Sequence, residues 1–137
     1  MTCFLIDDDQ IFQFITDSTL KRINPNISIE KYYDGEQGIN SIKERLDTPE
    51  TLPDIVMLDI NMPFMNGWDF LKEYHMINHK IQKNIHIYML TSSDDPDDIE
   101  KAKKISELSG YLIKPVTEVE LEVLIRGFPS MEWYQPK

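Results

Sequence analysis

The chain has 137 residues, of which 41% are hydrophobic, so it is long enough for one domain with a buried core and is not expected to be disordered. Its formal net charge of −10 excludes a general basic surface for nucleic acid or an anionic membrane. Cys3 is the single cysteine, so no disulfide can form within the chain, and a reducing cytoplasm is the expected location.

Short, continuous apolar runs predict buried strands. They lie at 3–6, 27–33, 55–58, 85–90 and 111–113. Runs without polar alternation are typical of a parallel sheet that helices cover on both faces.

The segments that follow these runs carry apolar residues at helical spacing, which predicts one helix after each strand. The residues expected to face the core are, helix by helix, Ile11, Phe14, Ile15 and Ile23; Ile39, Ile42 and Leu46; Phe70, Leu71, Tyr74 and Ile77; Ile99, Ala102 and Ile105; and Leu121, Leu124, Ile125 and Phe128. Strand–helix units repeated in this way predict a single α/β domain with a doubly wound sheet.

Some boundaries are marked by residues that begin or end helices. The acidic segment 94–98 predicts the start of the fourth helix, because acids and an early proline stabilise a first helical turn. Its residues are Asp94, Asp95, Pro96, Asp97 and Asp98. Gly110 is interpreted as the boundary between the fourth helix and the fifth strand.

Polar and charged side chains follow four of the predicted strands. They are Asp7, Asp8 and Asp9 after the first, Asp59 after the third, Thr91 and Ser92 after the fourth, and Lys114 after the fifth. Ligands of an open parallel sheet bind beyond the carboxyl ends of its strands, so these side chains are expected at one edge. Crowded carboxylates repel one another unless a cation neutralises them, and oxygen ligands without a thiolate favour Mg²⁺.

This set of side chains has the chemistry of phosphoryl transfer. A carboxylate can act as the nucleophile and become an aspartyl phosphate, whose oxygens need a cation and a hydrogen-bond donor. Lys114 could supply the cation and Thr91 the hydrogen-bond donor. Each residue alone has a simpler interpretation, since acids at strand ends form turns and cap helices, and a lone threonine or lysine is ordinary in a loop. The prediction of a site depends on their joint position.

Four motifs resemble those of the bacterial-type response regulator receiver domains. They are Phe4-Leu5-Ile6-Asp7-Asp8-Asp9, Met57-Leu58-Asp59-Ile60-Asn61-Met62-Pro63 with Asn66-Gly67, Leu90-Thr91-Ser92, and Leu112-Ile113-Lys114-Pro115. They occur in the family's order and with similar spacing. The resemblance implies a flavodoxin-like, doubly wound, five-stranded parallel sheet in the order 2-1-3-4-5 with five helices.

The resemblance also implies the roles of the acidic residues. Asp59 would be the phospho-acceptor, and Lys114 would pair first with its carboxylate and then with the phosphoryl group. The ligands of Mg²⁺ would be Asp7, Asp8, Asp59 and the backbone carbonyl of Asn61. The only catalysis expected is of the domain's own phosphorylation and dephosphorylation.

The same resemblance implies a switch within the domain and the binding partners of the protein. Thr91 would supply the switch hydroxyl, Tyr111 the aromatic that follows it, and the bond before Pro115 would be cis. Residues 1–126 would form the receiver and 127–137 a short tail without an output domain. The partners would be a sensor histidine kinase or histidine phosphotransfer protein and a downstream protein or second copy, with no nucleic acid and no membrane.

Two alternatives remain open at this point. A haloacid-dehalogenase-like phosphatase also uses an aspartyl nucleophile, and Asp7 and Asp9 have the required spacing. Against it, Ile11 stands where that family has threonine or valine, and its last acidic motif is missing after Lys114. A phosphorylation-independent pseudo-receiver would keep the fold as a binding module but usually lacks some of the acids, the threonine or the lysine.

Overall fold

The computed structural model describes residues 1–92 and 96–126. Strands and α-helices alternate along this part of the chain, with two short 3₁₀ turns. The strands are β1 (Thr2–Ile6), β2 (Ser28–Tyr32), β3 (Ile55–Asp59), β4 (His86–Thr91) and β5 (Leu108–Ile113). The helices are α1 (Gln10–Ile23), α2 (Gly35–Lys43), α3 (Gly67–Ile77), α4 (Pro96–Lys103) and α5 (Glu118–Arg126), and the turns are η1 (Pro49–Thr51) and η2 (Asn78–Lys80).

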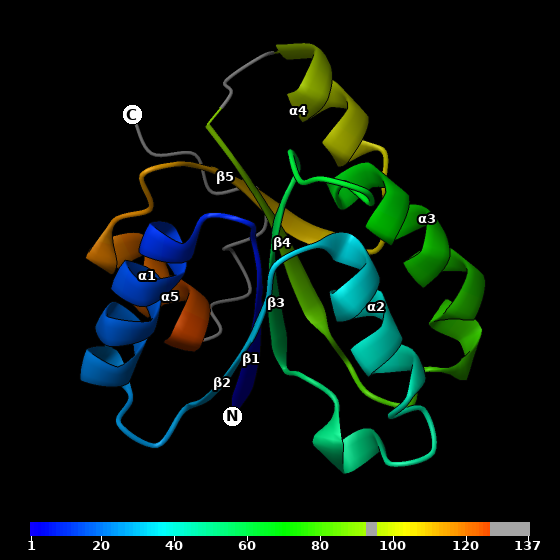
Figure 1. Ribbon diagram of the computed structural model, residues 1–137, viewed down its shortest axis with the longest axis horizontal. Helices are drawn as coiled ribbons and strands as arrows, with labels where there is room; N and C mark the ends of the chain where they lie inside the picture. Colours follow the sequence, from blue (N-terminus) through cyan, green and yellow to red (C-terminus); the bar gives the residue numbers. More distant parts are fainter. Residues whose placement is uncertain (93–95, 127–137) are drawn as a thin grey trace.

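The strands form one parallel sheet in the order β2-β1-β3-β4-β5, which confirms the predicted topology. Helices α1 and α5 lie on one face, and α2, α3 and α4 lie on the other (Figure 1). All five residues of β3 are buried, because this central strand has a helix layer on each side. The sheet thus separates two apolar cores and leaves its carboxyl edge for the polar residues.

Side-chain caps fix where the helices begin. The Asp9 carboxylate accepts hydrogen bonds from the backbone amides of Ile11 and Phe12, and Asp34 caps α2 in the same way. Asn66 and Asp69 form a reciprocal capping box at the start of α3. α4 begins at Pro96 with Asp97 and Asp98 in its first turn, as predicted, whereas Asp94 and Asp95 lie outside the described residues.

The prediction for the buried face of α1 is wrong for three of its four residues, whereas the fourth, Ile23, is half-buried and packs against the core. Ile11, Phe14 and Ile15 are 73%, 61% and 59% exposed. The buried residues of α1 are Gln13, Thr16 and Leu20. On this face Leu20 packs in the core, with Phe12 against it, and the Gln13 side chain donates to backbone carbonyl groups of β1 and β2.

Other boundaries also differ from the predictions. Gly110 lies inside β5 and pairs with Tyr88, next to a register shift, so it accommodates an irregularity in the sheet and does not end a helix. Leu46 lies beyond the end of α2, and Ile105 beyond the end of α4. Phe128 lies outside the described residues. Within residues 1–92 and 96–126, no helix has the length and apolarity to span a membrane.

Candidate functional site

Four adjacent strands bring the predicted residues to one edge of the sheet. Asp7 follows β1, Asp59 ends β3, Thr91 ends β4 and Lys114 follows β5. These strands are parallel neighbours, so their carboxyl ends lie together, as expected. Asp7 is 1% exposed and Asp59 is 6% exposed. The edge therefore holds two buried carboxylates, which water alone does not stabilise.

Lys114 is the cation at this edge. Its Nζ lies 2.6 Å from Oδ2 of Asp7 and 3.8 Å from Oδ2 of Asp59. The same ammonium lies 4.3 Å from the centre of the Phe12 ring, in a cation–π contact. We expected Lys114 to pair with Asp59; the shorter contact is with Asp7. The peptide bond between Lys114 and Pro115 is cis, as the resemblance implied.

Asp7, Asp8 and Asp59 have the arrangement of a cation site. One carboxylate oxygen from each lies within 4.8 Å of the others. In the part of the chain that the structure describes, this is the one such group of three acidic, histidine or cysteine side chains. Carboxylate oxygens fit Mg²⁺, which takes oxygen ligands and completes its shell with water or phosphate. Asn61 lies in the loop that leaves β3, and its carbonyl as a ligand stays a prediction.

The electrostatics of the two buried acids favour their protonated forms. Burial raises the pKa of Asp59 to about 7, and the nearby charges of Asp7 and Asp8 add to this effect. The positive charge of Lys114 opposes the shift without cancelling it. Burial also raises the pKa of Asp7, against hydrogen bonds from Lys114 and from the Asp9 backbone amide. When the three acids are ionised, they carry more negative charge than Lys114 neutralises, and a divalent cation would offset the excess.

The loop after β3 is fixed close to Asp59. The Gly67 amide donates to the Ile60 carbonyl at 2.9 Å, and the Ile60 amide donates to the Leu90 carbonyl at 3.1 Å. A Cβ atom on Gly67 would lie 2.6 Å from the Asp59 carbonyl oxygen, so only glycine permits this approach. The glycine of the Asn66-Gly67 motif therefore places α3 directly against the backbone of Asp59.

Thr91 and Tyr111 lie on the same face of the sheet. Met89 pairs with Tyr111 and Thr91 with Ile113, so Thr91 and Tyr111 are diagonal neighbours on adjacent strands. Thr91 is 0% exposed and Tyr111 is 1% exposed. The predicted pair is therefore adjacent, and the tyrosine ring is buried in the core between the sheet and α2, α3 and α4.

The model of the response regulator receiver domain family matches residues 3–126. The chain belongs to this family. It is therefore a signalling domain of two-component systems, and the haloacid-dehalogenase-like phosphatase is not its class.

Individual relatives agree with this assignment. The receiver domain is 29% identical over 129 residues to chemotaxis protein CheY1 of Helicobacter pylori, covering 91% of this chain and 97% of that protein. It is 30% identical over 124 residues to the uncharacterized transcriptional regulatory protein YcbL of Bacillus subtilis, covering 90% of this chain and 48% of that protein. A two component response regulator from Cytophaga hutchinsonii has a TM-score of 0.81 at 29% identity, over 91% of this chain and 93% of that one. The chain spans about half the length of YcbL and of the probable C4-dicarboxylate response regulator DctR of Halalkalibacterium halodurans.

The edge of the sheet that holds Asp7, Asp59, Thr91 and Lys114 is called the acidic edge below. Two residues beside it were not predicted from the sequence. Phe12 contacts the Lys114 ammonium, and Gln13 contacts the backbone of Asp7. Both lie on α1, where we assigned the inward face to Ile11, Phe14 and Ile15. A glutamine inside an apolar helical pattern was the available signal, because a buried amide needs hydrogen-bond partners.

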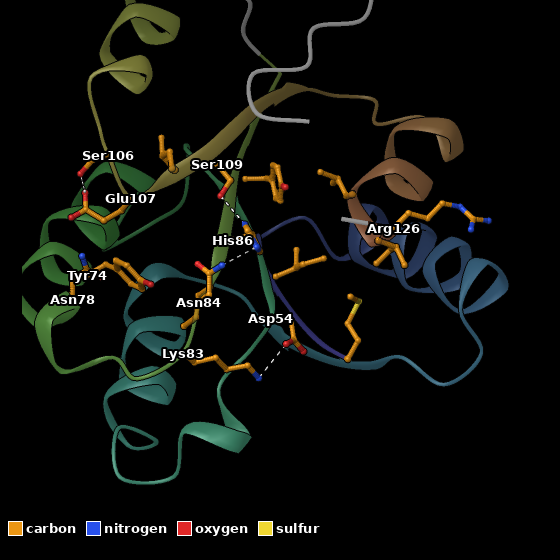
Figure 2. Close-up of a pocket in the computed structure, with 17 residues that line it drawn as sticks. Asp54, Tyr74, Asn78, Lys83, Asn84, His86, Ser106, Glu107, Ser109 and Arg126 are labelled. Atoms are coloured by element: carbon orange, nitrogen blue, oxygen red, sulfur yellow. Dashed lines mark hydrogen bonds and ion pairs between the residues drawn. The ribbon is translucent and has the colours of Figure 1, made fainter. Parts of the chain in front are cut away.

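A concave region lies at the opposite end of the sheet from these residues (Figure 2). It is a groove of about 750 Å³ at the amino edge of the sheet, and polar side chains account for much of its lining. Asp54 pairs there with Lys83, and His86 contacts Ser109. No residue of the acidic edge contributes to this lining, so the groove is separate from the candidate site.

Proposed function

We propose that this receiver domain takes up a phosphoryl group on Asp59. The observation that supports this proposal is the position of the Asp59 carboxylate, which lies 3.8 Å from the Lys114 ammonium and within the group formed with Asp7 and Asp8. A carboxylate oxygen attacks the phosphorus of a phosphohistidine, and a P–O bond forms as the P–N bond breaks. The electron pair leaves with the imidazole nitrogen, which then takes up a proton.

Asp7, Asp8, Asp59 and the Asn61 carbonyl would hold Mg²⁺, which supplies positive charge for the phosphoryl oxygens. Lys114 adds a second positive charge. Its ammonium has only to move from Asp7 towards Asp59 to reach an oxygen of the new phosphoryl group. Attack by water on the same phosphorus would return Asp59 to its carboxylate. We therefore infer that the domain catalyses only its own phosphorylation and dephosphorylation.

Intact mass measurement tests this function. With acetyl phosphate and Mg²⁺, the parent protein is expected to gain the mass of one phosphoryl group, and EDTA should prevent the gain. Asp59→Asn should show no gain, because an amide is not a competent nucleophile here. Asp54→Asn, which changes an acid at the opposite edge, should label like the parent. Equal labelling of Asp59→Asn would rule out Asp59 as the acceptor, and an unlabelled parent would favour the pseudo-receiver.

Thr91 and Tyr111 are proposed to carry the signal away from Asp59. A phosphoryl group would attract the Thr91 hydroxyl, and Tyr111 would repack in response. With beryllofluoride, a phosphoryl mimic, amide chemical shifts in the parent should change at Tyr111, 99–102 and 121–125. Thr91→Ala should still bind the mimic while these distant changes shrink. Changes of full size in Thr91→Ala would show that the signal takes another route.

The proposed donor is a sensor histidine kinase or a histidine phosphotransfer protein. A donor must cover the acidic edge, and α1 begins directly after the capping residue Asp9. The exposed residues Ile11, Phe14 and Ile15 lie at i, i+3 and i+4, a spacing that suits a partner helix. Phe64 is a further contact candidate in the loop after Asp59, since it is 92% exposed and keeps a φ of 65°, which is costly for an aromatic residue.

The remaining proposals concern the output and the setting. We infer that phosphorylation alters the surface formed by α4, β5 and α5, where a downstream protein or a second copy would bind. The receiver would comprise residues 1–126, with 127–137 as a tail, and the protein would act in the cytoplasm without binding nucleic acid.

A further inference from the structure

Gln13 makes an unusual set of contacts for a helix residue. Its side chain is 1% exposed and points from α1 towards the ends of two strands. The Nε2 group lies 3.1 Å from the Leu5 carbonyl oxygen, 2.9 Å from that of Asp7 and 2.8 Å from that of Tyr32. One amide therefore joins β1, the loop formed by residues 7–9 (the acidic loop) and the end of β2.

The contact with the Asp7 carbonyl reaches the metal ligands through the backbone. That carbonyl belongs to the peptide between Asp7 and Asp8, and a peptide is planar, so the direction of its oxygen fixes the direction in which the chain continues to Asp8. Asp7 is buried and held by other contacts: its amide donates to Tyr32, and its Oδ1 accepts from the Asp9 amide. Asp8 is exposed, so its orientation depends more strongly on the backbone.

We propose that Gln13 is a positioning residue for the acidic loop. Through the peptide that follows Asp7, its amide keeps the Asp8 carboxylate within reach of the carboxylates of Asp7 and Asp59. A neutral amide suits this place because it donates to carbonyl groups without adding charge beside the acids. A carboxylate there would repel the carbonyl oxygens, and an aliphatic side chain would leave them with fewer donors. The inference deepens the proposed function, since it rests on Mg²⁺ binding by these acids.

The expected effect is a loss of metal affinity without loss of the fold. Gln13→Met keeps the length of the side chain and removes its donors, so the Kd for Mg²⁺ should rise by about 10–100-fold, the usual consequence of losing a group that orients metal ligands. Thr16→Val is the matched control, because Thr16 is buried on the same face of α1 one turn further on.

Isothermal titration calorimetry with Mg²⁺, at a temperature where each variant is folded by circular dichroism, measures this effect. A parental Kd in Gln13→Met would overturn the role of Gln13, as would an equal loss in Thr16→Val, which would indicate a general effect of disturbing α1. If Gln13→Met does not fold, Gln13→Asn gives the same test, since its shorter amide cannot reach the three carbonyls. A parent that binds no Mg²⁺ would overturn this inference together with the proposed function.

Discussion

Asp59→Asn is expected to stabilise the protein at pH 8 in the presence of EDTA, by ~2–4 kcal/mol. The folded-state pKa of Asp59 is raised to about 7, whereas an aspartate in an unfolded chain titrates near pH ~4. Between these values the folded protein holds a proton that the unfolded chain has released, so the stability contributed by Asp59 falls as the pH rises. Above pH ~7 the full cost of a buried, repelled carboxylate is present, and asparagine removes it.

Urea denaturation of parent and variant from pH 4 to pH 8 measures this difference. The gain in the free energy of unfolding should grow with pH and nearly vanish at pH 4. Asp54→Asn is the control, and its expected change in the free energy of unfolding has the opposite sign. Burial raises the pKa of Asp54, but the Thr2 amide and Lys83 outweigh burial and lower it, so its loss should destabilise the protein at pH 8. A constant gain for Asp59→Asn across this range would show that ionisation of Asp59 is not its origin.

The strands and the acidic edge could be predicted because each strand is a run of consecutive apolar residues and the residues of the edge directly follow such runs. A run such as 55–58 is apolar throughout, which requires a strand covered on both faces. Once the strands are placed, their parallel order brings Asp7, Asp59 and Lys114 together without knowledge of any side-chain conformation. The topology itself followed from the family resemblance.

The buried face of α1 could not be predicted from apolar spacing. Ile11, Phe14 and Ile15 satisfy the helical pattern as well as a buried face would. The observed buried face adds hydrogen bonds of Gln13 with carbonyl groups of β1 and β2, and these positions exist only after the sheet has formed. Spacing records where apolar residues lie on a helix, but the surroundings decide which side of the helix is buried.

The carboxylate that lies closer to Lys114 could not be predicted from the sequence either. Asp7 and Asp59 both lie within reach of one ammonium, and only the folded positions of the side chains decide which is closer. The shorter contact, 2.6 Å, is with Asp7, the more deeply buried of the two. Lys114 therefore chiefly compensates the charge of Asp7, and Asp59 keeps its raised pKa.

Lys114→Met should destabilise the metal-free protein by ~3–5 kcal/mol at pH 8, because it leaves two buried carboxylates without their cation. Methionine retains a flexible apolar side chain beside Phe12, so the loss reports mainly the charge. The loss should be smaller at pH 5, where the acids of raised pKa take up protons. Mg²⁺ should restore part of the stability, since it supplies positive charge to the same carboxylates.

Double variants identify which carboxylate Lys114 compensates. Adding Asp7→Asn to Lys114→Met should recover more stability than adding Asp59→Asn, because Asp7 lies at 2.6 Å from the ammonium and Asp59 at 3.8 Å. Lys83→Met is the matched control: its partner Asp54 is 36% exposed, so this loss should stay within ~1 kcal/mol. Urea denaturation at pH 8 with EDTA gives all of these free energies. Equal losses for Lys114→Met and Lys83→Met would contradict a buried ion pair, and equal recovery in the two double variants would mean that Lys114 is shared between the two acids.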